Sequence, residues 1–258
     1  MKKLRFLCLA VVCMMIMTLL ISCAAAKHSE PFDFDGNAIP SEAVIDGVDD
    51  DELWQDENRV VVRFATSVVT VVRRSQAIYL FFKTMDQTPY RYVGSGDDTE
   101  VTRSDSVEFY FDSKLTRTSK PAANDYQINL GRDSRTRICS GTGWLKWMAL
   151  YSFEVREGDT AEDYDYYYVE AMLPVAQMNI GATEAVGIAF GQVDRFVDSN
   201  VDVEQNFTWT GLHVGGKLVD PQIPSTYMVL CPSSLEPGQA NRLYNYDEYV
   251  ALSAKEGA

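Results

Sequence analysis

The sequence predicts an all-β protein built as an antiparallel β-sandwich, and three observations predict this class. The body of the chain contains many short segments in which apolar and polar residues alternate with a period of two, as strands do. Clusters of Gly, Asp, Asn and Pro separate these segments, as tight turns require. The 3.6-residue period of an amphipathic helix is absent until Asn241–Lys255, which could form a terminal helix or a fraying tail.

Ten segments are candidate strands. They are Val60–Phe64, Val68–Arg73, Ala77–Lys83, Ser106–Asp112, Tyr126–Leu130, Thr136–Cys139, Leu150–Val155, Tyr166–Met172, Val186–Val193 and Tyr227–Leu230. This number of strands suits one sandwich of the jelly-roll or immunoglobulin-like type. Two short helical turns are also expected, one that tucks Trp54 into the sandwich and one within Val175–Ile180.

The segment Ser106–Asp112 indicates which side chains face the core. Its odd-numbered residues, a valine and two phenylalanines, share one face, and this face is the predicted core face. The even-numbered residues, which include Glu108 and Tyr110, share the other face. We expect that second face to be open to solvent or to a ligand, with Glu108 at its centre.

The first residues have the pattern of an export signal. Three basic residues precede an apolar run from Phe6 to Ile21, which is shorter than a typical membrane-spanning helix. Aliphatic and small residues directly before Cys23 resemble the lipobox of bacterial lipoproteins, whereas a plain signal peptide or a signal anchor is the alternative. We expect a signal peptide over 1–22 and a lipidated Cys23 with a flexible tether over 23–42, which would anchor the protein to the extracytoplasmic membrane surface.

The charge of the chain excludes one class of function. Its net charge is −14, and removal of residues 1–22, which hold three basic residues and no acidic ones, would make it −17. Nucleic acids and anionic lipids attract basic surfaces, so nucleic-acid binding is not expected.

Two of the five cysteines, Cys139 and Cys231, would remain thiols after removal of the signal and lipidation of Cys23. In an oxidising compartment they could form a disulfide, and two separately buried thiols are the alternative. No Cys-x-x-Cys pair or Cys/His cluster indicates zinc.

Four segments follow one another along the chain in a recognisable order. They are Ile45–Trp54, Ala77–Leu80, Asp105–Phe109 and Tyr168–Pro174, the last followed by Val186–Phe190 and Asp194. Together they resemble carbohydrate-binding module family 9 and the wider group of DOMON-like sandwiches. The resemblance spans about Ala43 to Leu230. It implies a sugar-binding module over 43–232, with a C-terminal tail over 233–258.

The resemblance also implies site residues, but the chain departs from the family at two of them. Characterised members hold a sugar between two tryptophans, and Thr102 and Leu218 occupy those positions here. The glutamate that bonds sugar hydroxyls in the family is kept as Glu108. The family glutamine maps to Gly191 or Gln192, depending on a one-residue shift.

A different aromatic platform could replace the missing pair. Trp144, in the glycine-led loop Gly141–Trp147, is the best candidate for an exposed ring, whereas Trp209 is expected to be half-buried. Modules of this family also bind calcium in loops, and Asp49–Asp51 or Asp97–Asp98 could supply ligands. A solvated acidic loop is the alternative.

The sequence therefore predicts a non-catalytic carbohydrate-binding lipoprotein that presents its sandwich at the cell surface and assists polysaccharide capture or catabolism. Glycoside hydrolases and transporters are candidate partners. Catalysis is disfavoured because the chain has two histidines, His28 and His213. Two alternatives stay open. One is a scaffolding lipoprotein without sugar binding, and the other is a haem-binding domain that uses His213 with Met148, Met172 or Met228.

Overall fold

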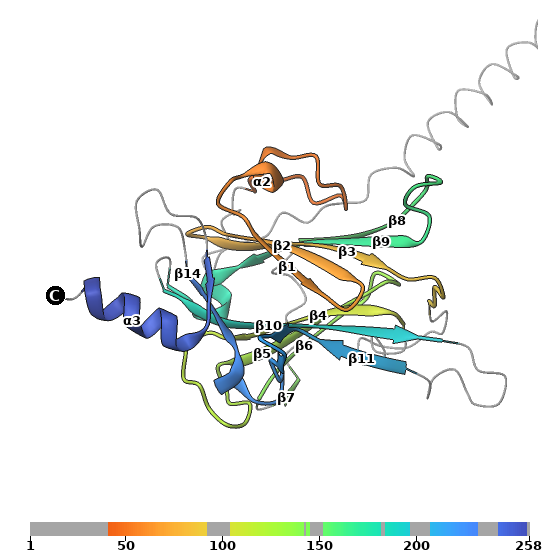
Figure 1. Cartoon of the computed structure of the whole chain (residues 1–258). Helices are drawn as coiled ribbons and strands as arrows, with labels where there is room; N and C mark the ends of the chain where they lie inside the picture. The colour runs from red at the N-terminus through yellow and green to blue at the C-terminus, as the bar shows by residue number, and fades with distance from the viewer. Residues whose placement is uncertain are drawn as a thin grey trace, which may run out of the picture.

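The computed structural model describes residues 41–91, 104–141, 143–144, 152–181, 184–196, 207–231 and 242–256. Within these ranges two antiparallel β-sheets face each other as the layers of a sandwich (Figure 1). The predicted all-β antiparallel sandwich is therefore confirmed. The predicted signal peptide, Cys23 and most of the tether lie outside the described residues. No helix within the described ranges is long and apolar enough to cross a membrane.

The smaller sheet has five strands in the order β1-β2-β3-β9-β8. Their bounds are β1 Val60–Phe64, β2 Ser67–Arg73, β3 Ala77–Met85, β8 Ser152–Glu157 and β9 Tyr166–Pro174. All neighbours are antiparallel. Each of these strands overlaps a segment that the alternation of the sequence predicts.

The larger sheet has the order β15-β14-β10-β4-β5-β6-β7, and β11 pairs with β10 beside β14. The bounds are β4 Ser106–Asp112, β5 Asp125–Gly131, β6 Thr136–Ser140, β7 Gly143–Trp144, β10 Val186–Arg195, β11 Phe207–Gly211, β14 Met228–Cys231 and β15 Arg242–Tyr244. The central strands have the strongest periodic signal in the sequence. Short β7 and β15 have none, because two or three residues are too few to show a period.

The other elements are short and lie outside the two layers. They are α2 Glu52–Gln55, η2 Val175–Met178, η4 Pro224–Thr226, α3 Tyr246–Glu256 and the hairpin of β12 His213–Val214 with β13 Lys217–Leu218. The predicted turn before Trp54 and the predicted short helix after Pro174 are both present. The C-terminal segment forms the terminal helix rather than a fraying tail, and in Figure 1 it extends from the end of the sandwich that carries β14.

Aromatic side chains fill the space between the sheets. Phe109 of β4 stacks on Phe190 of β10 with ring centroids 5.5 Å apart, and Phe111 stacks on Tyr126 of β5 at 4.8 Å. All three phenylalanines are fully buried, and each such burial stabilises the fold by about 2–3 kcal/mol. This packing fixes the inner face of β4 and therefore also the direction of its outer face.

The segment before β1 covers the outer face of the smaller sheet, as Figure 1 shows for α2. Trp54 is 3% exposed and donates its indole N–H to Oε1 of Glu170 on β9 at 2.9 Å. Oε2 of Glu170 accepts the backbone N–H groups of Asp46 and Gly47, both at 2.8 Å. Gly47 has φ +80°, and a Cβ there would lie 2.8 Å from Cβ of Arg156. Only glycine therefore fits at position 47, where this segment packs against Arg156.

Cys139 and Cys231 do not form the disulfide that the sequence left open. Cys139 lies on β6 and Cys231 on β14, which are four strand spacings apart in the sheet. Four spacings amount to about 19 Å, whereas disulfide bonding needs Cα atoms within about 7 Å. The thiols are separate, as in the other alternative, but only Cys231 is buried, whereas Cys139 is half-buried.

Candidate functional site

The strand register arranges the outer face of the larger sheet in rows. Two neighbouring rows run across β10, β4, β5 and β6, namely Gly191, Glu108, Asn129, Arg137 and then Ala189, Tyr110, Gln127, Cys139. The predicted site residues Glu108 and Tyr110 share this face, as expected from the alternation of β4.

The expectation that Glu108 lies at the centre of an open face was wrong, although Tyr110 lines a pocket on that face. Glu108 is 3% and Tyr110 is 4% exposed. The cause is Trp209 of β11, whose indole reaches across β10 at Gly191. A Cβ on Gly191 would lie 2.8 Å from Nε1 of Trp209 and 2.9 Å from Oε2 of Glu108. Strand alternation predicts which face a residue takes, but it does not show that a long side chain crosses a glycine to cover that face.

Glu108 is the centre of a buried hydrogen-bond cluster. Its carboxylate accepts from Nε1 of Trp209 at 2.7 Å, from Nε2 of Gln127 at 3.4 Å, from Oη of Tyr110 and from Nδ2 of Asn129. Burial raises the pKa of Glu108, and these four donors oppose the rise. Burial and the nearby Glu108 charge also raise the pKa of Tyr110, so its hydroxyl stays protonated and donates. An ionised carboxylate has about four acceptor positions, and the protein fills them here.

Gln192 does not join this cluster. It pairs with Val107 across β10 and β4 and points into the sandwich, on the opposite face from Glu108. Its Oε1 accepts from Oγ of Ser67 at 2.7 Å and from Oγ1 of Thr66 at 3.1 Å, both in the hairpin that joins β1 to β2. Gln192 is 4% exposed, and its amide ties the two sheets together.

A pocket of about 560 Å³ opens beside the Glu108 cluster, on the same outer face. Its floor includes Tyr110, Gln127 and Cys139 from the second row and Asp125 at the start of β5. The volume lies within the roughly 300–1,000 Å³ typical of small-ligand sites. No periodic signal marks the pocket, because its other walls come from loops around residues 120–121 and 221–222.

The walls of this pocket are tied together across the sequence. Nη1 of Arg117 donates to the carbonyl oxygen of Tyr227 at 3.2 Å, and the N–H of Ser225 donates to the carbonyl oxygen of Thr118 at 3.0 Å. The hydroxyl of Tyr227 donates to the carbonyl oxygen of Pro221 at 2.7 Å. Bonds between loops about a hundred residues apart hold the pocket in shape before any ligand arrives.

The loop that contains Trp144 reaches the edge of the same pocket. The backbone of Trp144 on β7 pairs with Cys139, which lines the pocket, while the side chain of Trp144 lies outside the description. The N–H of Gly141 donates to the carbonyl oxygens of Ala122 at 3.1 Å and Asp125 at 3.0 Å. A Cβ on Gly141 would lie 2.4 Å from the backbone of Ala122, so only glycine permits this approach.

One of the two positions where the family carries tryptophan can be placed. Leu218 on β13 is 37% exposed, and Thr102 lies outside the described residues. A Cβ on Gly211 would lie 3.0 Å from Cδ1 of Leu218 and 2.4 Å from Cη2 of Trp209. Trp209 and Leu218 therefore both lie against Gly211, and of the two Trp209 also contacts Glu108.

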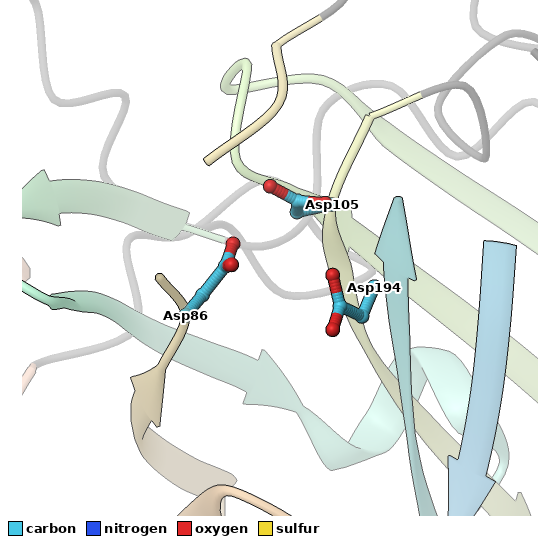
Figure 2. A group of neighbouring side chains, drawn as sticks. All are labelled: Asp86, Asp105 and Asp194. Atoms are coloured by element: carbon cyan, nitrogen blue, oxygen red, sulfur yellow. The ribbon is translucent and has the colours of Figure 1, made fainter. Parts of the chain in front are cut away.

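Three carboxylates converge at one end of the sandwich, away from this pocket. Figure 2 shows that Asp86, Asp105 and Asp194 face one another, and their oxygens lie within 4.8 Å. Nη1 of Arg132 lies 2.7 Å from Asp86 and 3.4 Å from Asp105. Burial, with a hydrogen bond to Asp86, raises the pKa of Asp105 to about 8. The guanidinium of Arg132 already compensates the charge of two of the three carboxyl groups, which does not fit a calcium site as it stands.

The two acidic loops that the sequence offered for calcium do not form a cluster of converging carboxylates within the described residues. Oδ2 of Asp51 accepts the N–H of Val44 at 2.8 Å, and Asp97–Asp98 lie outside the described residues. Calcium binding therefore stays a prediction.

The structure does not bring the candidate haem ligands together. His213 is exposed on the β12–β13 hairpin, with Nδ1 3.0 Å from the carbonyl oxygen of Gly211. Met172 is buried with Trp54 on the outer side of the smaller sheet, and Met228 is buried between the sheets. Met148 lies outside the described residues.

Comparison with known proteins places the fold. No family model and no curated protein sequence matches the chain. Two solved structures of a carbohydrate binding module family 9 from Caldicellulosiruptor kristjanssonii do match. The complex with cellotriose has a TM-score of 0.55 and 16% identity over 78% of this chain and 92% of that one. The complex with glucose has a TM-score of 0.52 and 17% identity over 74% and 92%. The chain thus has the β-sandwich fold of carbohydrate-binding module family 9, and the predicted resemblance is confirmed at the level of the fold.

Proposed function

We propose that the protein is a non-catalytic carbohydrate-binding protein whose ligand site is the pocket beside Glu108. The observation that carries the proposal is this preformed pocket of about 560 Å³ on the outer face of the larger sheet. Tyr110, Asp125 and Gln127 line it together with aromatic and apolar residues, and sites that recognise sugar hydroxyls and sugar ring faces combine these two kinds of surface.

In this proposal Glu108 positions other residues instead of contacting the sugar itself. Its acceptor positions are filled by donors from Trp209, Tyr110, Asn129 and Gln127, and it is 3% exposed. Because two of those donors, Tyr110 and Gln127, also line the pocket, Glu108 fixes the orientation of groups that can reach a ligand. Trp144 remains the candidate for ring stacking, since its backbone pairs with pocket residue Cys139.

The proposal includes the location that the first residues predict. A signal peptide over 1–22 and a lipidated Cys23 would hold the sandwich at an extracytoplasmic membrane surface, joined by the tether over 23–42. Anchored modules can act with weak individual affinity because several neighbours engage one polymer. A role in polysaccharide capture beside a glycoside hydrolase or a transporter follows from that placement. Metabolic labelling with palmitate tests it, and a Cys23→Ala variant should lose both the label and membrane association.

Calorimetry against cello-, xylo- and manno-oligosaccharides, with and without calcium, tests sugar binding. We expect binding that weakens at least tenfold in Gln127→Ala and Trp144→Ala. Exposed Gln87→Ala, away from the pocket, is the matched control and should bind as the parent does. Absence of binding tighter than millimolar to any of these sugars would favour the scaffolding alternative. A Soret absorption band on the purified protein would instead favour haem.

A further inference from the structure

A second pocket lies on the outer face of the larger sheet, separate from the pocket beside Glu108. Its volume is about 410 Å³, which is also within the range typical of small-ligand sites. The segment after β4, the segment before β10 and helix α3 form its walls, with residues 113–115, Glu184, Ala185, Tyr246 and Tyr249. We call it the α3 pocket, and the pocket beside Glu108 the first pocket.

Two tyrosine rings of α3 form one side of the α3 pocket. The helix begins with reciprocal bonds, from the N–H of Glu248 to Oδ1 of Asn245 at 2.9 Å and from the N–H of Asn245 to Oε2 of Glu248 at 3.0 Å. Tyr246 and Tyr249 are three positions apart, so they share one face of the helix, and their ring centroids are 6.3 Å apart. Both rings are half-buried, so a ligand in the pocket can contact them.

An ion pair supplies polar groups to the α3 pocket. Nζ of Lys114 lies 2.9 Å from Oε2 of Glu184, and the two side chains are 34% and 49% exposed, so a ligand can reach them. The N–H of Gly181 and the ammonium of Lys114 lower the pKa of Glu184, which is therefore ionised at neutral pH. The α3 pocket thus combines aromatic rings with a charged donor and a charged acceptor, the combination that sugar rings and hydroxyls require.

The two pockets are neighbours on one face of the sheet. Asp125, which lines the first pocket, pairs with Asp112 on β4, and Asp112 pairs with Gly187 on β10. Asp125 is therefore two strand spacings, about 10 Å, from Gly187. Ala185 of the α3 pocket comes two residues before Gly187 and is buried with Val229, the residue opposite Gly187 on β14. The α3 pocket therefore begins on the same outer face, a short distance from the first pocket.

The loop between β4 and β5 forms a wall between the pockets, and Arg117 in this loop contacts both sides. Its Nη1 donates to the carbonyl oxygen of Tyr227, which lines the first pocket, at 3.2 Å. Its guanidinium carbon lies 3.8 Å from the ring centroid of Tyr246 in the α3 pocket. Oδ2 of Asp112 accepts the N–H of Arg117 at 2.7 Å and so holds the loop at this point. These contacts fix the two pockets relative to each other before a ligand arrives.

Resting on the proposed function, we infer that the α3 pocket is a second subsite, which binds another unit of the same oligosaccharide. The ligand is then a chain of sugars long enough to pass over the loop at Arg117, and not a single sugar. Tyr249 supplies the ring face, because Arg117 already covers one face of Tyr246. Lys114 and Glu184 bond hydroxyls of the sugar. Occupying a second subsite with the same chain strengthens binding, because the loss of translational freedom is not repeated.

The dependence of affinity on chain length tests this inference. The parent is titrated calorimetrically with the trisaccharides and hexasaccharides of the cello-, xylo- and manno- series. We expect the hexasaccharide of the preferred series to bind about tenfold more tightly than its trisaccharide. Tyr249→Ala should remove this gain and leave the affinity for the trisaccharide unchanged. Gln127→Ala, in the first pocket, should instead weaken binding of both chain lengths.

Two further variants separate a subsite from a general effect on the fold. Lys114→Ala leaves the sequence of α3 unchanged and should also reduce the gain with chain length. Tyr164→Ala removes an exposed tyrosine between β8 and β9 and should retain the full gain. A hexasaccharide that binds the parent no more tightly than the trisaccharide, or a gain that both Tyr249→Ala and Lys114→Ala retain, would overturn the inference while the proposed function stands. If the parent binds no sugar of either length, the proposed function itself fails and the inference fails with it.

Discussion

Trp209 donates its indole N–H to Oε2 of Glu108 at 2.7 Å, although their strands, β11 and β4, are not neighbours. The bond crosses β10 at Gly191, whose missing side chain makes the space. The resemblance assigned Glu108 to bonds with sugar hydroxyls, but donors of the protein itself fill its acceptor positions. In our proposal the sugar is recognised by the neighbouring row of residues, Tyr110 and Gln127, and by the pocket beside them.

The Glu108–Trp209 bond should be measurable as a coupling energy. Glu108→Gln places an amide N–H₂ among four donors, and we expect the free energy of unfolding to fall by about 1–3 kcal/mol. Trp209→Phe removes one of those donors, so the two changes together should cost less than their sum. The coupling, expected at about 0.5–3 kcal/mol, is measured by urea unfolding of both single variants and the double variant. Exposed Glu162→Gln is the control, and simple additivity of the first two changes would contradict a direct bond.

A side chain at position 191 should destabilise the protein. Gly191→Ala puts a methyl group 2.8 Å from Nε1 of Trp209 and 2.9 Å from Oε2 of Glu108, so the indole must move. We expect a loss of about 1–3 kcal/mol and a shift in tryptophan fluorescence. Gly187→Ala, on the same strand, is a matched control because the nearest side-chain atoms are 3.2 Å or more away. Equal effects of the two variants would show that loss of strand glycine, and not the Trp209 contact, is responsible.

The sequence predicts the strand that carries Glu108, but it does not predict the side chain that covers this residue. Alternation predicts β4 with its observed bounds, Ser106–Asp112, and the correct face for every residue in it. It does not predict that Trp209 covers Glu108, since that depends on the pairing of β11 with β10 and on a glycine between them.

The sequence pattern does not predict the pocket either, for a related reason. Its walls meet through hydrogen bonds such as the one from Arg117 to the carbonyl oxygen of Tyr227, 110 residues apart in sequence, and contacts of this kind leave no local pattern.

Gln192 shows the limit of mapping one residue from a family. A one-residue shift on a strand moves a side chain to the opposite face, and here it moves the amide from the outer face into the sandwich.

Stability should fall as the pH rises, partly because of Glu170. Burial raises the pKa of Glu170 from 4.5 to about 7, opposed by the N–H groups of Gly47, Asp46 and Trp54. The folded state therefore holds this proton more tightly than the unfolded state does. Its contribution to stability is fully present below pH 4.5 and is lost as the pH rises to about 7. Asp105, with its pKa raised to about 8, acts in the same direction.

The substitution Glu170→Gln tests this contribution, because it removes the titrating group. Melting temperatures between pH 4.5 and pH 8 should decline less steeply for the variant than for the parent, although the Asp105 part of the decline remains. Exposed Glu52→Gln is the control and should follow the slope of the parent. Parallel curves for Glu170→Gln and the parent would contradict a raised pKa at Glu170.

The two cysteines of the sandwich should behave independently. We expect both to react with a thiol reagent after unfolding without reductant, and the melting temperature to be the same with and without reductant. Cys231→Ser puts a hydroxyl among the buried Ala185 and Val229 and should cost about 1–3 kcal/mol. Cys139→Ser should cost less, because that thiol is half-buried and already faces Oε1 of Gln127 at 3.6 Å. Equal losses of about 4–5 kcal/mol, as for a disulfide that closes a long loop, would contradict this account.

Arg132 should decide whether the aspartate cluster can hold a cation. Its guanidinium is 3% exposed, contacts Asp86 and Asp105, and is bonded by Nε to Glu157 at 2.8 Å. Arg132→Met leaves the carboxylates without this counter-charge, and we expect the free energy of unfolding to fall by about 3–5 kcal/mol.

The same variant removes the guanidinium from Asp86 and Asp105. One oxygen from each of these two residues and one from Asp194 lie within 4.8 Å of one another, which suits the 2.3–2.6 Å bond lengths that calcium prefers. Calcium should therefore raise the melting temperature of Arg132→Met and leave that of the parent unchanged, relative to buffer with a chelator. Adding Asp194→Asn to Arg132→Met removes one carboxylate and should reduce this rescue. Stabilisation of the parent by calcium would mean that the cation binds beside Arg132 or at another site. The variant Asp194→Asn in the parent background distinguishes these two cases, because only binding beside Arg132 depends on the Asp194 carboxylate.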